Sequence, residues 1–208
     1  MSIPADELHG ILDFLRAAES LKHTTRTSWT STGTPETVAA HTWRLCLMAL
    51  VLAPRFPGID LGKLLRICLV HDLGEAIGGD ISAVLQEGAP SKADQERRDL
   101  LQLVAPLPAS AQHDMVALWD EYEQAMSPEA RLAKGLDKLE TILQHNQGVM
   151  PDDFDFRFNL QYGARYTTDD PILRVIRAVL DEETERRAQE RSRALEREQS
   201  TEHRPHAP

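Results

Sequence analysis

The sequence has few cysteines and no excess of positive charge. Cys46 and Cys68 are its two cysteines among 208 residues. Each lies in an apolar helical run, which favours buried free thiols over a disulfide and indicates a reducing compartment. The 23 Lys and Arg residues against 33 Asp and Glu residues give a formal charge of −10. This charge argues against binding of a nucleic-acid polymer or an anionic membrane surface, although a metal ion or one arginine can hold a phosphate inside an acidic protein.

Long apolar runs and strand signals are also missing. No apolar run approaches the roughly 18 residues of a membrane span. The acidic start "MSIPADELHG" lacks the basic and apolar pattern of a secretory signal, so we expect a cytoplasmic protein. Alternating Val, Ile and Thr segments are scarce, whereas helical periodicity is common. We therefore expect an all-α fold with one helical domain over residues 1–180 and a charged helical or disordered tail over residues 181–208.

Apolar residues at helical spacing predict the positions of the main helices. Thr34, Pro35 and Glu36 are typical of a helix start, and Gly78 with Gly79 is typical of a helix end. Asp80 is then a candidate cap for a short following helix. The Thr- and Ser-rich stretch 23–35 predicts an extended loop, and the aromatic stretch that begins "VMPDDFDFRF" predicts an irregular segment that covers a site or, preferably, contacts another subunit. The predicted helices span about 5–21, 35–53, 61–77, 91–108, 110–125, 127–148 and 169–198.

Four residues on three predicted helices are candidate metal ligands: His41, the pair His71 and Asp72, and Asp137. His41 shares a helix face with Leu45, so it points toward the core, where a hydrogen-bonded core histidine is the alternative. The pair can reach one ion from its helix flank, or it can be a solvated helix end. Asp137 lies beside an apolar stripe, and alone it would be expected to face solvent.

The order of these residues along the chain favours the metal-ligand interpretation over the structural alternatives. A His, then an HD pair about 30 residues later, then an Asp about 65 residues further on, resembles the HD-domain metal-dependent phosphohydrolase superfamily. The resemblance implies an HD-domain helical bundle in which His41, His71, Asp72 and Asp137 bind a divalent metal ion.

Longer motifs narrow the resemblance. The stretches "RTSW", "PETVAAHTWR", "HDLGEAIGGD" and "KGLDKLETILQ" are similar to the 5′-deoxynucleotidase branch, over roughly residues 10–165. That branch implies hydrolysis of nucleoside 5′-monophosphates to nucleoside and phosphate, a divalent ion such as Co²⁺, Mn²⁺ or Mg²⁺, and a homodimer.

The same resemblance implies roles for the remaining candidates. Glu75 matches the glutamate of an HDxxE motif and would act with Asp72 in catalysis, as a base or a water-orienting group; its alternative is an exposed helix acid. Asp80 would lie near the substrate sugar or cap a helix. Arg26 and Trp29 would contact the phosphate and the nucleoside, because arginine offers a fork of donors and tryptophan can stack.

Two other functions remain open at this stage. One is another HD hydrolase chemistry, either a phosphodiesterase or a nucleoside-triphosphate triphosphohydrolase. The short chain and its single set of ligands favour a small monoester substrate instead. The other is a non-catalytic nucleotide sensor, which the retained Glu75 and the complete ligand set disfavour.

Overall fold

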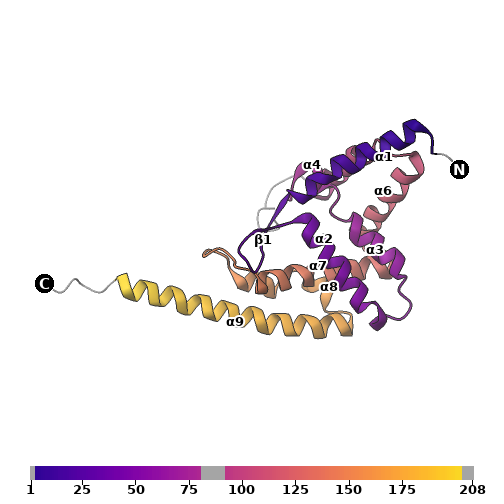
Figure 1. Ribbon diagram of the computed structural model, residues 1–208. Helices are drawn as coiled ribbons and strands as arrows, with labels where there is room; N and C mark the ends of the chain where they lie inside the picture. Colours follow the sequence, from indigo (N-terminus) through magenta and orange to yellow (C-terminus); the bar gives the residue numbers. More distant parts are fainter. Residues whose placement is uncertain (1–2, 81–91, 203–208) are drawn as a thin grey trace.

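The computed structural model describes residues 3–80 and 92–202 and confirms the all-α prediction (Figure 1). Within these residues the sheet consists of two short antiparallel strands that pair Thr25 with Thr37 and Trp29 with Pro35. The elements are α1 (Ala5–Ala18), η1 (Glu19–Lys22), β1 (Thr25–Trp29), β2 (Pro35–Thr37), α2 (Val38–Leu52), η2 (Ala53–Arg55), α3 (Leu61–Val70), α4 (Glu75–Gly78), α5 (Lys92–Val104), α6 (Ala109–Gln124), α7 (Pro128–Gln147), η4 (Phe156–Leu160), α8 (Ala164–Thr167) and α9 (Pro171–Glu202).

Helix α7 forms the centre of the fold. It contacts α2 and α3 on one side and α9 on the other, as Figure 1 shows. Its residues Leu136, Leu139 and Ile142 are therefore fully buried. Ser127 caps the helix by accepting a hydrogen bond from the Ala130 amide, as expected for a serine before a proline. A central helix covered on both sides has to place any polar residues against internal partners, and this requirement shapes the site described below.

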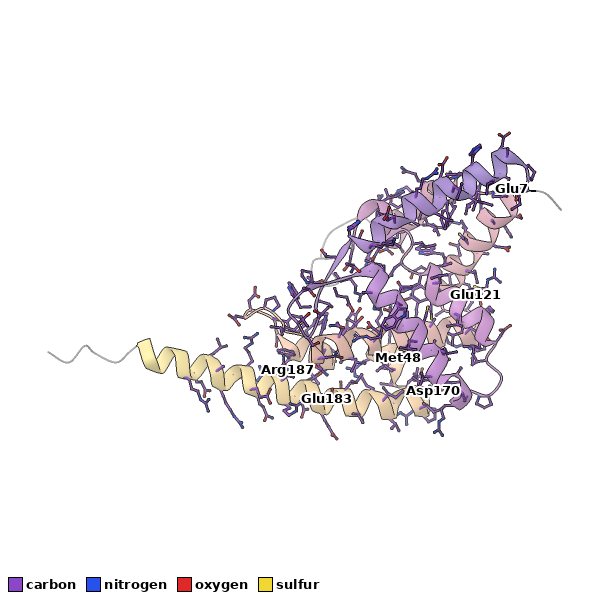
Figure 2. The ribbon with its side chains drawn as sticks, viewed as in Figure 1. Glu7, Met48, Glu121, Asp170, Glu183 and Arg187 are labelled. Carbon is purple, nitrogen blue, oxygen red and sulfur yellow. The ribbon has the colours of Figure 1, made fainter. Side chains whose placement is uncertain are left out.

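Helix α9 is held to the body along much of its length. Leu173 and Leu180 belong to the main hydrophobic core. Beyond Leu180 the helix continues to Glu202, with Thr184 and Ala188 buried. Arg187, labelled in Figure 2, donates to the Gly148 carbonyl at 3.0 Å. The segment after residue 180 thus starts as a packed helix, while the division of the chain into a domain and a tail stays a prediction.

Two local expectations are wrong. The stretch 23–35 is not only a loop, because it contains β1 and leads into β2, which share backbone hydrogen bonds. The helix expected from residue 35 begins at Val38, and its cap is Thr37, whose hydroxyl accepts from the Ala40 amide. Pro35 belongs instead to the edge strand β2, where its missing amide hydrogen costs little.

The helix expected over 61–77 is interrupted. α3 ends at Val70 with His71 as its C-cap, and α4 starts at Glu75. Gly74 lies between them, and a Cβ there would be 2.4 Å from the Glu96 carbonyl oxygen of α5. The bare glycine therefore lets the chain turn close against α5. The short helix expected immediately after Asp80 lies outside the described residues, as does Ser91, the cap expected for the helix over 91–108.

Cys46 and Cys68 are both free thiols, as expected. Among the described residues, no helix is long and apolar enough to cross a membrane.

Candidate metal centre

Two buried histidines face each other between α2 and α3. Their ring centres lie 5.6 Å apart. The Nδ1 atom of His71 donates to the Cys68 carbonyl at 2.7 Å, and the Nδ1 atom of His41 bonds to the Glu140 carboxylate. Each ring therefore presents its Nε2 atom to the interior, where neither of these buried atoms has a partner in hydrogen-bond geometry among the described residues. Such an Nδ1 anchor is the usual way in which a protein orients a metal-binding imidazole.

Two carboxylates complete the cluster. Asp72 Oδ2 lies 3.0 Å from His71 Nε2 and 3.8 Å from His41 Nε2. Asp137 Oδ1 lies 3.1 Å from His41 Nε2 and 3.9 Å from His71 Nε2. Since Asp137 is only 4% exposed, the solvent-facing alternative is excluded. The fold brings all four predicted ligand residues to one point.

This donor set fits a divalent metal ion. Within the part of the chain that the structure describes, the two buried Nε2 atoms make no hydrogen bond and face the oxygens of two carboxylates, so an ion among them would be offered four donor atoms. Imidazoles with carboxylates suit first-row divalent ions. Glu36 and Glu140 form a second candidate cluster with His41, but Glu140 already accepts from Arg44 Nε at 2.5 Å and from His41. The first cluster is therefore the better cation site.

Asp137 is held from behind by two groups that motif analysis missed. Its Oδ2 atom accepts from the Tyr122 hydroxyl at 2.7 Å and lies 2.8 Å from Lys138 Nζ. The Tyr122 ring also contacts His71 edge-on, with ring centres 5.1 Å apart. Tyr122 thus touches two ligand residues at once. The sequence signal for Glu140 is its place one turn after Asp137, but nothing in the spacing of Tyr122 indicates its role.

The buried charges shift one another's protonation. Burial raises the pKa of Asp72, but the two histidines, His71 first, outweigh it and hold the pKa below its usual range. The pKa of Asp137 is likewise lowered, since Lys138 and the histidines outweigh burial. Burial and the Arg26 charge lower the pKa of His41, yet its carboxylate neighbours raise it overall to about 9. Without a metal ion, the carboxylates and a protonated His41 therefore stabilise one another's charged forms.

Glu75 stands at the edge of this cluster. It is 3% exposed, so it is not an exposed helix acid, and its Oε2 atom has no hydrogen-bond partner within residues 3–80 and 92–202. Burial, followed by the charges of Asp72 and Asp80, raises its pKa to about 10, despite the opposing charge of Lys92. Lys92 Nζ lies 3.6 Å from Glu75, 3.1 Å from Glu96 and 3.8 Å from Asp80. Lys92 therefore belongs to the site and is not simply part of a solvated helix face.

Arg26 connects strand β1 to the ligand cluster. Its Nη2 atom donates to Thr141 at 2.9 Å, and its Nη1 atom lies 3.5 Å from Asp72 Oδ2. Its Nε atom is buried, lies 3.5 Å from Glu36, and has no hydrogen-bond partner among the residues that the structure describes. Trp29 lies three residues along the same strand. The guanidinium is thus fixed beside the carboxylates with one donor unused.

These residues line a single cavity of about 1220 Å³. His71, Asp72, Glu75 and Asp137 form one part of its wall, and Arg26, Trp29 and Asp80 line it as well. His41 is fully buried behind this wall. The volume exceeds the several hundred cubic ångströms typical of small-molecule sites. Every residue expected to serve the site therefore lies at the cavity or directly behind it.

Comparison with known proteins agrees with this geometry. The HD domain family matches residues 18–176. The chain belongs to the HD domain family. An HD domain implies divalent metal binding, and His41, His71 and Asp137 form a cluster that could hold an ion, so the coarse prediction of a metal-binding HD domain is confirmed.

Relatives and solved structures extend the comparison. The chain is 37% identical to 5′-deoxynucleotidase HDDC2 of Bos taurus, over 66% of this chain and 67% of that protein. It is 33% identical to the protein of the same name in Homo sapiens, over 70% and 75% of the two chains. A crystal structure described as a predicted metal-dependent phosphohydrolase from Magnetospirillum magnetotacticum superposes with a TM-score of 0.76. It is 26% identical and covers 89% of this chain and 96% of that one.

Proposed function

We propose that this chain is a metal-dependent 5′-deoxynucleotidase, which hydrolyses deoxynucleoside 5′-monophosphates to nucleoside and phosphate. The buried cluster of His41, His71, Asp72 and Asp137 carries the proposal, because it opens into a large cavity beside a fixed arginine. The names of the relatives support it, since proteins called 5′-deoxynucleotidase align with most of the chain.

The four cluster residues would hold the ion through the two Nε2 atoms, Asp72 and Asp137. A divalent ion bound there would offset phosphate charge and lower the pKa of an attached water. The protein's contribution is orientation. Cys68 and Glu140 fix the imidazoles.

Arg26 would bind the phosphate of the substrate. Its guanidinium is held by Thr141 and by the nearby carboxylates of Asp72 and Glu36, so little side-chain freedom is lost when an anion arrives. Arg26 lines the cavity, and a guanidinium carries a fork of N–H donors that suits phosphate oxygens. In this arrangement Asp72 serves both the cation cluster and the position of Arg26.

Glu75 would act as the base or water-orienting group. Its carboxylate, once deprotonated, can take a proton from water as that water's oxygen forms a bond to phosphorus. The bond from phosphorus to the 5′ oxygen then breaks, and that oxygen gains a proton as the nucleoside leaves. Lys92, within 3.6 Å of Glu75, favours the deprotonated carboxylate. Asp80 lines the same cavity and would lie near the sugar.

We extend the proposal to the metal ion, the cellular location, the oligomeric state and the partners. The mixed imidazole and carboxylate set suits Co²⁺ or Mn²⁺, with Mg²⁺ as a further candidate. We also propose a cytoplasmic homodimer. The formal charge of −10 disfavours nucleic-acid polymers and anionic membranes as partners.

A phosphate-release screen tests the proposal. Protein loaded separately with Co²⁺, Mn²⁺ and Mg²⁺ is incubated with deoxynucleoside and ribonucleoside 5′-monophosphates, and nucleoside and phosphate are measured. Nucleoside and phosphate should be released in equal amounts from the deoxynucleoside 5′-monophosphates. Failure with every monophosphate would contradict it.

Product identity separates the remaining functions. Release of triphosphate from a nucleoside triphosphate, or of a monoester from a diester, would indicate another HD hydrolase chemistry. The Asp72→Ala variant tests the sensor alternative. Unchanged nucleotide binding and metal content in this variant would favour a sensor and contradict the assigned cluster.

A further inference from the structure

The segment that follows α7 brings aromatic side chains to the cavity. Phe154, Phe158 and Tyr162 all line it and are half-buried. They come from the stretch that sequence analysis preferred as a subunit contact. Since their side chains face the cavity of this same chain, they form part of its wall.

A series of contacts connects two of these rings to the metal centre. Lys138 Nζ lies 2.8 Å from Asp137 and 5.2 Å from the centre of the Tyr162 ring. The Phe158 ring centre lies 5.3 Å from that of Tyr162. Passing along the wall from the ligand cluster, the order is therefore a carboxylate, an ammonium and then two rings. A phosphate monoester whose leaving group carries a flat ring likewise has a charged group at one end and an aromatic surface at the other.

Helix α9 holds this wall in place. Arg177 is 5% exposed, and it donates to the carbonyls of Asn159 at 2.8 Å, Leu160 at 2.7 Å and Tyr162 at 2.8 Å. These bonds fix the backbone on both sides of the rings. A surface that is already ordered loses little conformational entropy when a ligand binds.

Two other aromatic side chains of the wall, Phe154 and Trp29, belong to a separate small hydrophobic cluster. Phe154 already has edge contacts with His145 and Phe156, at ring-centre distances of 4.8 Å and 5.1 Å. Trp29 packs on the same small cluster as Phe154. The pair Phe158 and Tyr162 is therefore the better platform for a ligand ring.

We propose that Phe158 and Tyr162 form the nucleobase subsite and thereby select nucleotides over other phosphate monoesters. The inference rests on the proposed function. Stacking uses the face of a base, which purines and pyrimidines share. The subsite should therefore distinguish a substrate with a base from one without a base more strongly than it distinguishes one base from another.

The test compares two substrates that differ by the base. Deoxyadenosine 5′-monophosphate and deoxyribose 5-phosphate share the phosphate and the sugar. In Phe158→Ala, the ratio of their kcat/KM values should fall about tenfold relative to wild type, as expected for loss of one stacking contact. The fall should come from a higher KM for the nucleotide. Phe158→Tyr, which keeps a ring, should restore the ratio.

Controls keep this inference separate from the proposed function. Trp43→Ala removes an aromatic side chain that is 66% exposed on α2 and should leave the ratio unchanged. If Phe158→Ala does not fold, Phe158→Leu keeps most of the volume, and the same fall is expected. A ratio unchanged in a folded variant, or an equal loss with both substrates, would overturn the subsite. A wild-type enzyme inactive on all nucleotides would instead overturn the proposed function, and the subsite with it.

Discussion

The two carboxylate oxygens of Asp137 have different partners. One oxygen faces the histidines, whereas the other is held by Tyr122 and Lys138 at 2.7 and 2.8 Å. This division keeps the carboxylate turned toward the ion, in the manner of the outer partners that orient metal ligands.

Loss of the Tyr122 hydroxyl should therefore weaken metal binding. In Tyr122→Phe the ring contact with His71 can remain, but the hydrogen bond to Asp137 cannot form. We expect metal affinity to fall by about 10-fold to 100-fold, measured by competition with a chromogenic chelator. Tyr166→Phe, at another tyrosine of the cavity wall, is the matched control and should bind metal normally. Equal affinity in wild type and Tyr122→Phe would contradict this role.

The protonation of His41 gives a second prediction. Its pKa without metal is raised from the ordinary 6.5 to about 9. A group with a raised pKa in the folded state stabilises the fold fully below its unfolded pKa, and this contribution is lost as the pH rises through the folded pKa. The raised pKa of Glu75 acts in the same direction across this range. The melting temperature of metal-free protein should therefore fall between pH 6.5 and 9.

Metal-loaded protein is the comparison for that experiment. Because an imidazole must be neutral to bind an ion, metal binding releases protons and becomes stronger as the pH rises. Thermal unfolding of the loaded protein should show a smaller fall, or a rise, over the same pH range. Parallel curves for the two forms would contradict the placement of His41 in the metal site.

The sequence predicted the site residues that a motif specifies by residue type and by order along the chain. His41, the HD pair and Asp137 lie together as expected, because their motif reflects one chemical requirement. The supporting groups could not be predicted in the same way. Tyr122 reaches Asp137 from α6, and such a contact depends on how the helices pack. Lys138 directly follows Asp137 on α7, but no spacing rule indicates that its side chain turns back to that carboxylate. Glu140 is intermediate, since its place one turn after Asp137 on α7 gives a usable signal.

At the scale of elements, capping and packing explain what sequence periodicity alone missed. The apolar pattern continues across His71, so it predicts one helix over 61–77, yet the close approach of Gly74 to α5 requires a turn. Strand β1 is short and polar, and it forms because β2 and α7 are beside it. Neither feature leaves a periodic signature.

The hydrogen bonds of Arg177 should contribute to the stability of the fold. This side chain joins α9 to three carbonyls around the aromatic wall. It also donates to Asp181, one turn later on the same helix, at 2.6 Å. Arg177→Lys keeps the charge but loses the planar fork that serves several acceptors. We expect a loss of about 3 kcal/mol in the free energy of unfolding, measured by urea denaturation.

A second arginine on the same helix controls for the substitution itself. Arg174 is exposed and donates to the Thr168 carbonyl at the surface. Arg174→Lys should change the unfolding free energy by less than about 0.5 kcal/mol. Similar losses in both variants would show that the buried network is not the cause.

At the scale of the whole molecule, the cavity depends on a helix distant in sequence from the metal ligands. After Leu180, α9 still bonds to the end of α7 and to the residues that follow it. Thr184 donates to Asn146 at 2.9 Å. Arg191 donates to the carbonyls of Met150 and Pro151 at 3.1 and 2.6 Å. A boundary drawn at residue 180 from polarity alone would therefore cut through a packed element.

Two truncations test that dependence. A chain ending at Leu180 loses the contacts of Thr184, Arg187 and Arg191, so its melting temperature should fall and its KM for nucleotides should rise. A chain ending at Arg197 keeps those contacts and should resemble the full chain. If the shorter truncation has an unchanged melting temperature and KM, the end of α9 does not support the site.

Metal dependence of phosphate release tests the central claim most directly. The protein is stripped of metal with a chelator, assayed on deoxyadenosine 5′-monophosphate, and assayed again after one divalent ion is returned. We expect no release from the stripped protein, restored release after reloading, and none from reloaded Asp137→Asn that remains folded. Undiminished release from the stripped protein or from Asp137→Asn, or none after reloading with any candidate ion, would contradict the account.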